Sequence, residues 1–135
     1  MQSNALAVED PQALAQQVSE HMYGNDQASQ GLGLSLDSVA PGAANMSMTV
    51  RADMLNGHKT CHGGFIFALA DSTFAFACNS RNAPTVASGC TIDYLAPAFE
   101  GDVLTARAVE ALRAADADLD AAIVRGDADA YMSAN

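Results

Sequence analysis

The sequence predicts an α+β fold in which an antiparallel β-sheet wraps around one long central α-helix. The first observation is the segment 63–80, GGFIFALADSTFAFACNS, whose only polar residues between Phe65 and Cys78 are Asp71, Ser72 and Thr73. A helix that is apolar nearly all round must be buried on most sides. The second observation is that the segments on both sides of it are patterned as strands, which would supply a covering sheet.

The chain length and charge limit the class of protein. At 135 residues the chain is expected to form a single domain, 1–135, with an N-terminal helix region at 1–30 and a divergent or shortened C-terminal end at 114–135. The net charge is −10 and there are only six basic residues, so nucleic acid is excluded as a partner.

The cysteine content and the N-terminus indicate the compartment. The three cysteines are an odd number without paired spacing, which is typical of a reducing environment. The N-terminal MQSNALAVEDPQ has neither the basic region nor the apolar stretch of a secretory signal, and no segment is long enough to span a bilayer. We therefore expect a cytoplasmic protein without a membrane partner.

The segment 10–23 is predicted to be an N-terminal helix. Asp10 suits the N-cap and Pro11 the first helical position. Apolar residues then recur at a spacing of four, at Leu14, Val18 and Met22. Glycine and asparagine at positions 24 and 25 end the helix.

Strands are predicted before and after the central helix. Apolar and polar residues alternate in 32–36 and 46–51, with Pro41 and Gly42 between them as a turn, so these segments are expected to form a hairpin. The segment 85–95 is rich in β-branched residues, with one side formed by Val86, Cys90, Ile92 and Tyr94. The segment 103–112 is assigned as a strand from its place in the pattern.

The C-terminal end has two interpretations. Residues 119–124 and 130–132, separated by turn residues 125–129, fit a short closing hairpin. The alternative is a frayed or disordered acidic tail, because the segment consists mostly of alanine and aspartate.

Asp71 is the first candidate for chemistry. A carboxylate within an apolar helix loses water, so such residues are usually paired or functional. The structural alternatives are a helix-face Asp bonded to a nearby Ser or Thr, or an Asp exposed at an oligomer interface.

The second candidate is the loop NGHKTCHGG, residues 56–64, which leads into the start of the central helix. The first-turn amides of a helix have no internal acceptor, and the helix dipole adds partial positive charge there. A thioester carbonyl bound to such an amide is polarised, and the oxyanion that forms after attack is stabilised. Gly63 suits this role because its backbone, without a Cβ, permits close approach.

The spacing of these two candidates predicts an oligomer. Gly63 and Asp71 are eight residues apart, or roughly 12 Å along a helix axis. One chain therefore cannot bring its own Asp71 to its own Gly63 amide. Two antiparallel helices about a two-fold axis would place each Asp71 near the other chain's Gly63, so we expect an obligate homodimer.

Together, MLNGHKTCHGG, the helix FALADSTFAFACNS and the segment ASGCTIDYLAPAFEGD resemble the hotdog thioesterases of phenylacetate degradation over residues 12–112. The resemblance implies a hotdog fold, a homotetramer built from two dimers, and phenylacetyl-CoA or ring-hydroxylated relatives as substrates. It implies that Asp71 is the catalytic nucleophile or base, that Gly63 is the oxyanion-hole amide, and that Asn56 and His62 line the site. It implies no cofactor, because coenzyme A is part of the substrate.

Further substrate contacts are expected at Gly64 and, as a secondary candidate, Thr73. Few cations are available for the coenzyme A phosphates, so Lys59 and Arg81 are the candidates. Relatives often carry a basic residue where this chain has Ala96, and their closing strands are longer than the segment after residue 113. These departures put the phosphate contacts and the sheet edge in question.

Other readings of the sequence remain open. Cys61 beside His62 suggests a thiol nucleophile, although such a dyad usually comes from distant segments. The histidines and cysteines lack metal-ligand spacing, so no metal is expected. An acyl-CoA-binding protein without turnover, or a hotdog hydratase or dehydratase using His62, would use the same pocket. The aromatic residues that would line an aryl pocket, or else pack in the core, are Phe65, Phe67, Phe74, Phe76 and Tyr94.

Overall fold

The structure of the chain is a computed structural model that describes residues 10–87, 89–113, 116–124 and 128–134. The α+β class, with an antiparallel sheet and a central helix, is confirmed. In chain order the elements are α2 (Pro11–Asn25), α3 (Gln27–Gly31), β1 (Ser35–Ala40), β2 (Ala43–Thr49), the 3-10 helix η1 (Ala52–Met54), α4 (Gly63–Cys78), β3 (Cys90–Tyr94), β4 (Val103–Arg113), β5 (Asp116–Val124) and β6 (Ala128–Ala134).

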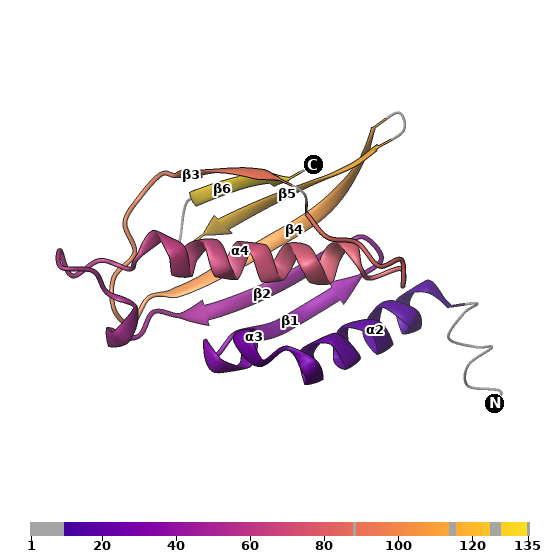
Figure 1. Cartoon of the computed structure of the whole chain (residues 1–135), viewed down its shortest axis with the longest axis horizontal. Helices are drawn as coiled ribbons and strands as arrows, with labels where there is room; N and C mark the ends of the chain where they lie inside the picture. The colour runs from indigo at the N-terminus through magenta and orange to yellow at the C-terminus, as the bar shows by residue number, and fades with distance from the viewer. Residues whose placement is uncertain (1–9, 88, 114–115, 125–127, 135) are drawn as a thin grey trace.

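Over the described residues, six strands form one antiparallel sheet in the order β1-β2-β4-β5-β6-β3. Helix α4 packs against β2, β4 and β5, and α2 packs against β1 at one edge. Figure 1 shows the sheet curving around α4, with β3 and β6 on one side of the helix and β1 on the other. No helix of the described residues is long and apolar enough to cross a membrane.

The core lies between α4 and the concave face of the sheet. The helix contributes Ile66, Leu69, Ala70, Phe74, Phe76 and Ala77, and the sheet contributes Met46, Met48, Leu104, Ala106 and Ala108. The small side chains of Ala106 and Ala108 leave room for the bulky side chains of α4, because close packing requires large and small residues to alternate. Of the candidate aromatic residues, Phe74 and Phe76 are buried in this core.

The expectation that α4 is buried on most sides is wrong for the single chain. Gly64 and Asp71 are exposed, and Phe65, Phe67, Ala68, Ser72, Ala75 and Cys78 are only half-buried. The physical reason is that the sheet curves around one side of the helix only. The other side of the helix is only partly covered by the described residues, one contact being the hydrogen bond between the hydroxyls of Ser72 and Ser29 of α3.

The N-terminal helix is confirmed, and its N-cap is Asp10, whose carboxylate accepts hydrogen bonds from the backbone N–H groups of Gln12 and Ala13. The short helix α3 was not expected from the sequence. The Asp26 carboxylate caps it by accepting the Ser29 N–H at 2.9 Å. A helix of five residues is too short to show an apolar periodicity in the sequence, so only its N-cap residue Asp26 could have indicated it.

The hairpin of β1 and β2 is confirmed, with Pro41 and Gly42 in its turn. Gly42 has φ +76°, a left-handed conformation that favours glycine. Strand β1 begins three residues later than the expected 32, because residues 32 and 33 end helix α3 in a turn. Strand β2 is likewise shifted toward the turn relative to 46–51.

The third expected strand is shorter than 85–95, because β3 begins at Cys90. The side chain of Asn79 explains part of this: it accepts the Thr85 N–H at 2.9 Å and donates to the Thr85 carbonyl at 3.0 Å. The backbone of Thr85 is thereby satisfied without a neighbouring strand. Val86, expected to share one side of this strand with Cys90, lies before the strand and is 89% exposed.

The strand expected at 103–112 and the hairpin expected at the C-terminal end are both present. The segment 103–112 is a strand, β4. The C-terminal hairpin is also confirmed, and β5 and β6 are longer than the short closing strands expected. The turn residues 125–127 lie outside the described residues. The tail alternative is wrong, since β6 pairs with both β5 and β3 and joins the two parts of the sheet.

Candidate active site

The loop before α4 is fixed to the body of the protein by backbone hydrogen bonds. The Cys61 N–H donates to the Ala98 carbonyl and the His62 N–H donates to the Met54 carbonyl, each at 2.8 Å. Leu55 and Cys61 also form an isolated antiparallel bridge across the loop. These bonds hold the loop against η1 and the segment before β4, so the start of α4 has a defined position.

Asn56 organises the inside of this loop. Its side-chain oxygen accepts the backbone N–H groups of His58 at 2.9 Å and Thr60 at 3.2 Å. Its side-chain nitrogen donates to the Thr60 hydroxyl at 3.0 Å. An Asn amide carries two N–H donors, so one remains for a substrate or water. Asn56 therefore shapes the loop and keeps one polar group for a ligand.

The start of α4 presents free amides. His62 is the exposed N-cap residue, and its side chain makes no capping bond. Among the described residues, no acceptor bonds the N–H of Gly63 or of Gly64, whereas the Phe65 N–H donates to the His62 carbonyl at 3.0 Å. The first-turn amides of a helix are suited to a negatively charged or polarised oxygen. Gly63, the candidate oxyanion amide, and Gly64, the candidate substrate contact, thus lie side by side at the start of the helix.

A cavity of about 390 Å³ opens beside these amides. It is lined by Cys61, Gly63, Ile66, Tyr94, Leu95, Ala96 and Pro97. The Tyr94 hydroxyl donates a hydrogen bond to the Gly63 carbonyl at 3.1 Å. A Cβ atom on Gly63 would lie 3.1 Å from the Tyr94 ring, so glycine permits the close packing of tyrosine against the helix. The lining is mostly apolar and suits a hydrophobic part of a substrate.

Asp71 lies on the open face of α4, about two turns after Gly63. Although its side chain reaches solvent, the surrounding apolar groups partly desolvate it, and this burial raises the pKa of Asp71 above its ordinary value. No group of the described residues donates a hydrogen bond to this carboxylate, so it is available to a substrate or a water molecule. A carboxylate with a raised pKa is a stronger base and nucleophile.

Burial disfavours the thiolate form of two cysteines, Cys61 and Cys78. Burial raises the pKa of Cys61, whose Sγ points to the His62 carbonyl at 3.6 Å and not to the imidazole. Burial also raises the pKa of Cys78, and the charge of Asp71 raises it further. A nucleophilic cysteine requires a thiolate, so neither the burial nor the orientation of Cys61 favours the alternative of a Cys61–His62 dyad.

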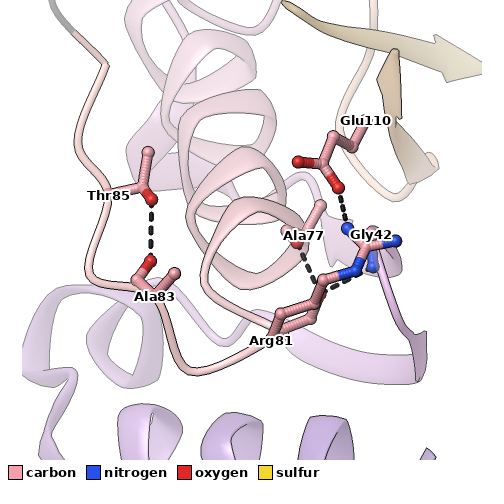
Figure 2. Close-up of polar contacts among 7 residues, drawn as sticks. Gly42, Ala77, Arg81, Ala83, Thr85 and Glu110 are labelled. Carbon is pink, nitrogen blue, oxygen red and sulfur yellow. Dashed lines mark hydrogen bonds and ion pairs between the residues drawn. The ribbon is translucent and has the colours of Figure 1, made fainter. Parts of the chain in front are cut away.

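The other residues expected to bind substrate lie in different places. Thr73 is fully buried and donates to the Leu69 carbonyl at 2.7 Å, so it is not on the face that carries Asp71. Lys59 is exposed in the loop, with φ +65°. Arg81 lies beyond the C-terminal end of α4 and forms an ion pair with Glu110 beside Gly42, as Figure 2 shows.

The contact between Tyr94 and the oxyanion loop was not expected from the sequence. Tyr94 ends β3 and follows Gly63 by 31 residues. A tyrosine in a β-branched segment predicts only a strand. Its position next to Gly63 depends on the path of β3 at the edge of the sheet. Within the described parts of the chain, no cluster of three or more His, Cys, Asp or Glu residues is placed to hold a metal ion.

A helix wrapped by an antiparallel sheet, with free amides at its start and a carboxylate on its open face, is the arrangement of a hotdog-fold thioesterase. Residues 58–111 match the model of a family described as the thioesterase superfamily. The chain is 53% identical to the acyl-coenzyme A thioesterase PaaI of Escherichia coli over 94 residues, 70% of this chain and 67% of that protein. The chain belongs to the thioesterase superfamily.

Solved structures agree with this assignment. The structure of the E. coli PaaI protein from the phenylacetic acid degradation operon has a TM-score of 0.89 and 42% sequence identity, and the match covers 93% of each chain. The structure of the TT0310 protein from Thermus thermophilus has a TM-score of 0.76 and 42% identity, and the match covers 81% of this chain and 94% of that one.

Proposed function

We propose that this chain is an acyl-CoA thioesterase that hydrolyses phenylacetyl-CoA or hydroxyphenylacetyl-CoA type thioesters to the free acid and CoA, in aromatic catabolism. The proposal rests on the amides of Gly63 and Gly64 at the start of α4 and on the carboxylate of Asp71 on the same helix, none of which has a hydrogen-bond partner within the part of the chain that the structure describes. The similarity to the acyl-coenzyme A thioesterase PaaI supports the substrate class.

The thioester carbonyl oxygen binds at the Gly63 N–H. The amide polarises the carbonyl and stabilises the negative charge that develops on the oxygen when the carbonyl carbon is attacked. Removing a single oxyanion-hole donor typically costs about 10²- to 10³-fold in kcat, so this amide is a major contributor to the rate. The apolar cavity beside Gly63 accommodates the adjoining hydrophobic part of the substrate.

Asp71 supplies the nucleophile or the base. In one route its carboxylate attacks the carbonyl carbon, the C–S bond breaks, CoA leaves as thiolate, and water then hydrolyses the mixed anhydride. In the other route the carboxylate takes a proton from the water that attacks the carbonyl carbon directly. Either route requires the ionised carboxylate, and the raised pKa increases its basicity.

The site is completed by a second copy of the chain. Asp71 and Gly63 are separated along α4, so the Asp71 that serves one Gly63 amide comes from the other subunit of a homodimer. The open apolar face of α4 supports this arrangement. We further propose that two dimers form a tetramer, that the enzyme needs no cofactor, and that it is cytoplasmic.

Asn56 and His62 have supporting roles in this proposal. The free N–H of the Asn56 amide bonds the attacking water or the thioester, while its other polar groups hold the loop. His62, exposed at the N-cap, orients the loop or bonds the sulfur as it leaves. Lys59 is exposed and available to coenzyme A phosphate, whereas Arg81 would have to exchange its ion pair with Glu110.

The test is thiol release from phenylacetyl-CoA, a hydroxyphenylacetyl-CoA and a straight-chain acyl-CoA. The wild type is compared with Asp71→Asn, which removes the charge but keeps the shape of the side chain. Glu20→Gln is the control, because Glu20 is an exposed carboxylate on α2, away from the loop. We expect turnover of the aryl substrates by wild type and Glu20→Gln, and a loss of several orders of magnitude in Asp71→Asn.

The outcomes separate the proposal from its alternatives. Full activity in Asp71→Asn would remove Asp71 from the mechanism. Binding of the acyl-CoA without thiol release by the wild type would identify a binding protein. Conversion of an enoyl- or hydroxyacyl-CoA without thiol release would identify a hydratase or dehydratase.

A further inference from the structure

Tyr94 is joined to the oxyanion loop by two different contacts. Its hydroxyl donates to the Gly63 carbonyl at 3.1 Å, and its ring packs where a Gly63 side chain would be. Tyr94 is the last residue of β3, an edge strand, so this side chain connects the sheet edge to the first turn of α4. The neighbouring Leu95, Ala96 and Pro97 line the same cavity.

The carbonyl that accepts this bond belongs to the same peptide unit as the Gly64 N–H. A donor at the carbonyl oxygen draws electron density toward the oxygen and makes the N–H at the other end of the unit a stronger donor. The Gly64 N–H has no acceptor among the described residues, and Gly64 is exposed next to the Gly63 amide. Two adjacent amides are therefore available at the start of α4.

We propose that Tyr94 is a positioning residue for the thioesterase reaction. Its hydroxyl fixes the Gly63–Gly64 peptide and strengthens the Gly64 N–H as a second donor to the oxyanion, beside the Gly63 N–H. This inference rests on the proposed function, because it concerns an oxyanion that only acyl transfer would form. Tyr94 acts through the peptide and not by contact with the reacting atoms.

The inference predicts a specific kinetic change. The charge on the carbonyl oxygen is small in the bound substrate and large in the transition state, so a weaker Gly64 donor lowers kcat and leaves KM nearly unchanged. Loss of one neutral hydrogen bond corresponds to a fall of about three- to tenfold in kcat. The acid limb of the kcat–pH profile is expected to keep its midpoint, because the Tyr94 hydroxyl bonds the Gly63 carbonyl and not a carboxylate.

The experiment compares Tyr94→Phe with Tyr23→Phe, using phenylacetyl-CoA as substrate. Both variants remove a hydroxyl that donates to a backbone carbonyl, since Tyr23 bonds the Leu34 carbonyl at 2.6 Å. Tyr23 lies on α2, so its variant measures the general cost of such a loss. We expect a three- to tenfold lower kcat only in Tyr94→Phe, measured well below the melting temperature of each variant.

Three results would overturn the inference. The first is a wild-type kcat in Tyr94→Phe. The second is an equal loss in Tyr23→Phe, and the third is a rise in KM with unchanged kcat, which would show a role in substrate binding alone. In each case thiol release by the wild type and its loss in Asp71→Asn would leave the proposed function standing. Absence of turnover by the wild type would instead refute both.

Discussion

Asp71 follows Gly63 by eight residues on α4, which places its carboxylate about two turns, or roughly 12 Å along the axis, from the free Gly63 amide. Both groups are accessible in the single chain, yet they cannot act on the same carbonyl. A substrate carbonyl and its attacking group must be about 3 Å apart in a productive complex. Under the proposed function, each complete site therefore draws on two chains.

This requirement predicts complementation between two inactive variants. One chain carries Asp71→Asn and the other carries Gly63→Pro, which removes the amide hydrogen. In a mixed dimer one site has both intact groups and the other has neither. Random reassembly of equal amounts should restore about a quarter of wild-type activity, because half the dimers are mixed and each has one working site of two.

The control is each variant taken alone through the same dissociation and reassembly. We expect both to stay inactive, and thiol release from phenylacetyl-CoA is the measurement. Activity that remains at the background of the single variants after mixing, with mixed dimers demonstrated by mass spectrometry, would show that one chain holds the whole site.

Proline at position 63 is compatible with the local backbone and tests the amide directly. His62 has φ −59° and ψ +134°, a conformation that favours a following proline, and the first helical position tolerates proline well. Gly63→Ala adds a comparable Cβ contact with Tyr94 but keeps the N–H. We expect kcat to fall by about 10²- to 10³-fold in Gly63→Pro and by much less in Gly63→Ala. Equal losses would assign the effect to crowding of Tyr94 and not to the amide.

Much of the fold follows from local sequence signals. The cap of Asp10 and the apolar spacing after it specify α2, and the apolar run after Gly63 specifies α4. These features act within one element, so the sequence displays them directly. The residue at which β3 begins cannot be predicted from its own segment, because the side chain of Asn79, from a different segment, bonds the backbone of Thr85.

The candidate site was predictable to a similar extent. Asp71 and Gly63 were identified from a polar residue in an apolar helix and from glycines at a helix start. The apolar pattern could not tell whether α4 is covered by its own sheet or by a second chain, so an exposed Asp71 was only one of the alternatives. The contact of Tyr94 with Gly63 depends on the path of an edge strand and has no local signature.

The raised pKa of Asp71 predicts opposite effects on stability and activity. Desolvation disfavours the carboxylate in the folded protein, so the folded state holds its proton more tightly than the unfolded state. The contribution of Asp71 to the free energy of unfolding therefore falls as the pH rises from its pKa in the unfolded state to its higher pKa in the folded state. Above the folded-state pKa the whole destabilisation is present. Asp71→Asn should melt at a higher temperature than wild type at pH 7, while being inactive.

Thermal unfolding at fixed protein concentration measures this effect. The advantage of Asp71→Asn should shrink as pH falls below the ordinary pKa of an aspartate, since the wild-type carboxyl is then neutral in both states. A variant that melts at or below the wild-type temperature at pH 7 would show that the carboxylate is stabilised by its surroundings.

The same shift sets the acid limb of activity. Because the reaction requires the carboxylate, kcat should fall as pH drops through the pKa of Asp71 in the enzyme–substrate complex. Burial places this midpoint above the ordinary value of about 3.9 for an aspartate. The measurement is kcat for phenylacetyl-CoA against pH, within the range where the protein stays folded. A midpoint at or below the ordinary value would contradict a desolvated carboxylate.

The turn between β1 and β2 offers a test of stability that is independent of catalysis. The buried Ser80 hydroxyl accepts the Gly42 N–H and donates to the Ala77 carbonyl, each at 2.7 Å, and so joins the hairpin to the end of α4. Ser80→Ala leaves a buried N–H without an acceptor, which typically costs about 1–3 kcal/mol. Thr85→Ala is the matched control, because its hydroxyl donates to the Ala83 carbonyl at the same 2.7 Å but is exposed.

We expect Ser80→Ala to lower the melting temperature by several degrees and Thr85→Ala to change the free energy of unfolding by less than about 0.5 kcal/mol. Thermal and urea unfolding at equal protein concentration provide the comparison. Neither residue lies at the start of α4, so kcat should be preserved in both variants well below the melting transition. Equal stability of the two variants would mean that water replaces the Ser80 hydroxyl, and that the hairpin is held by its backbone bond between Glu110 and Gly42.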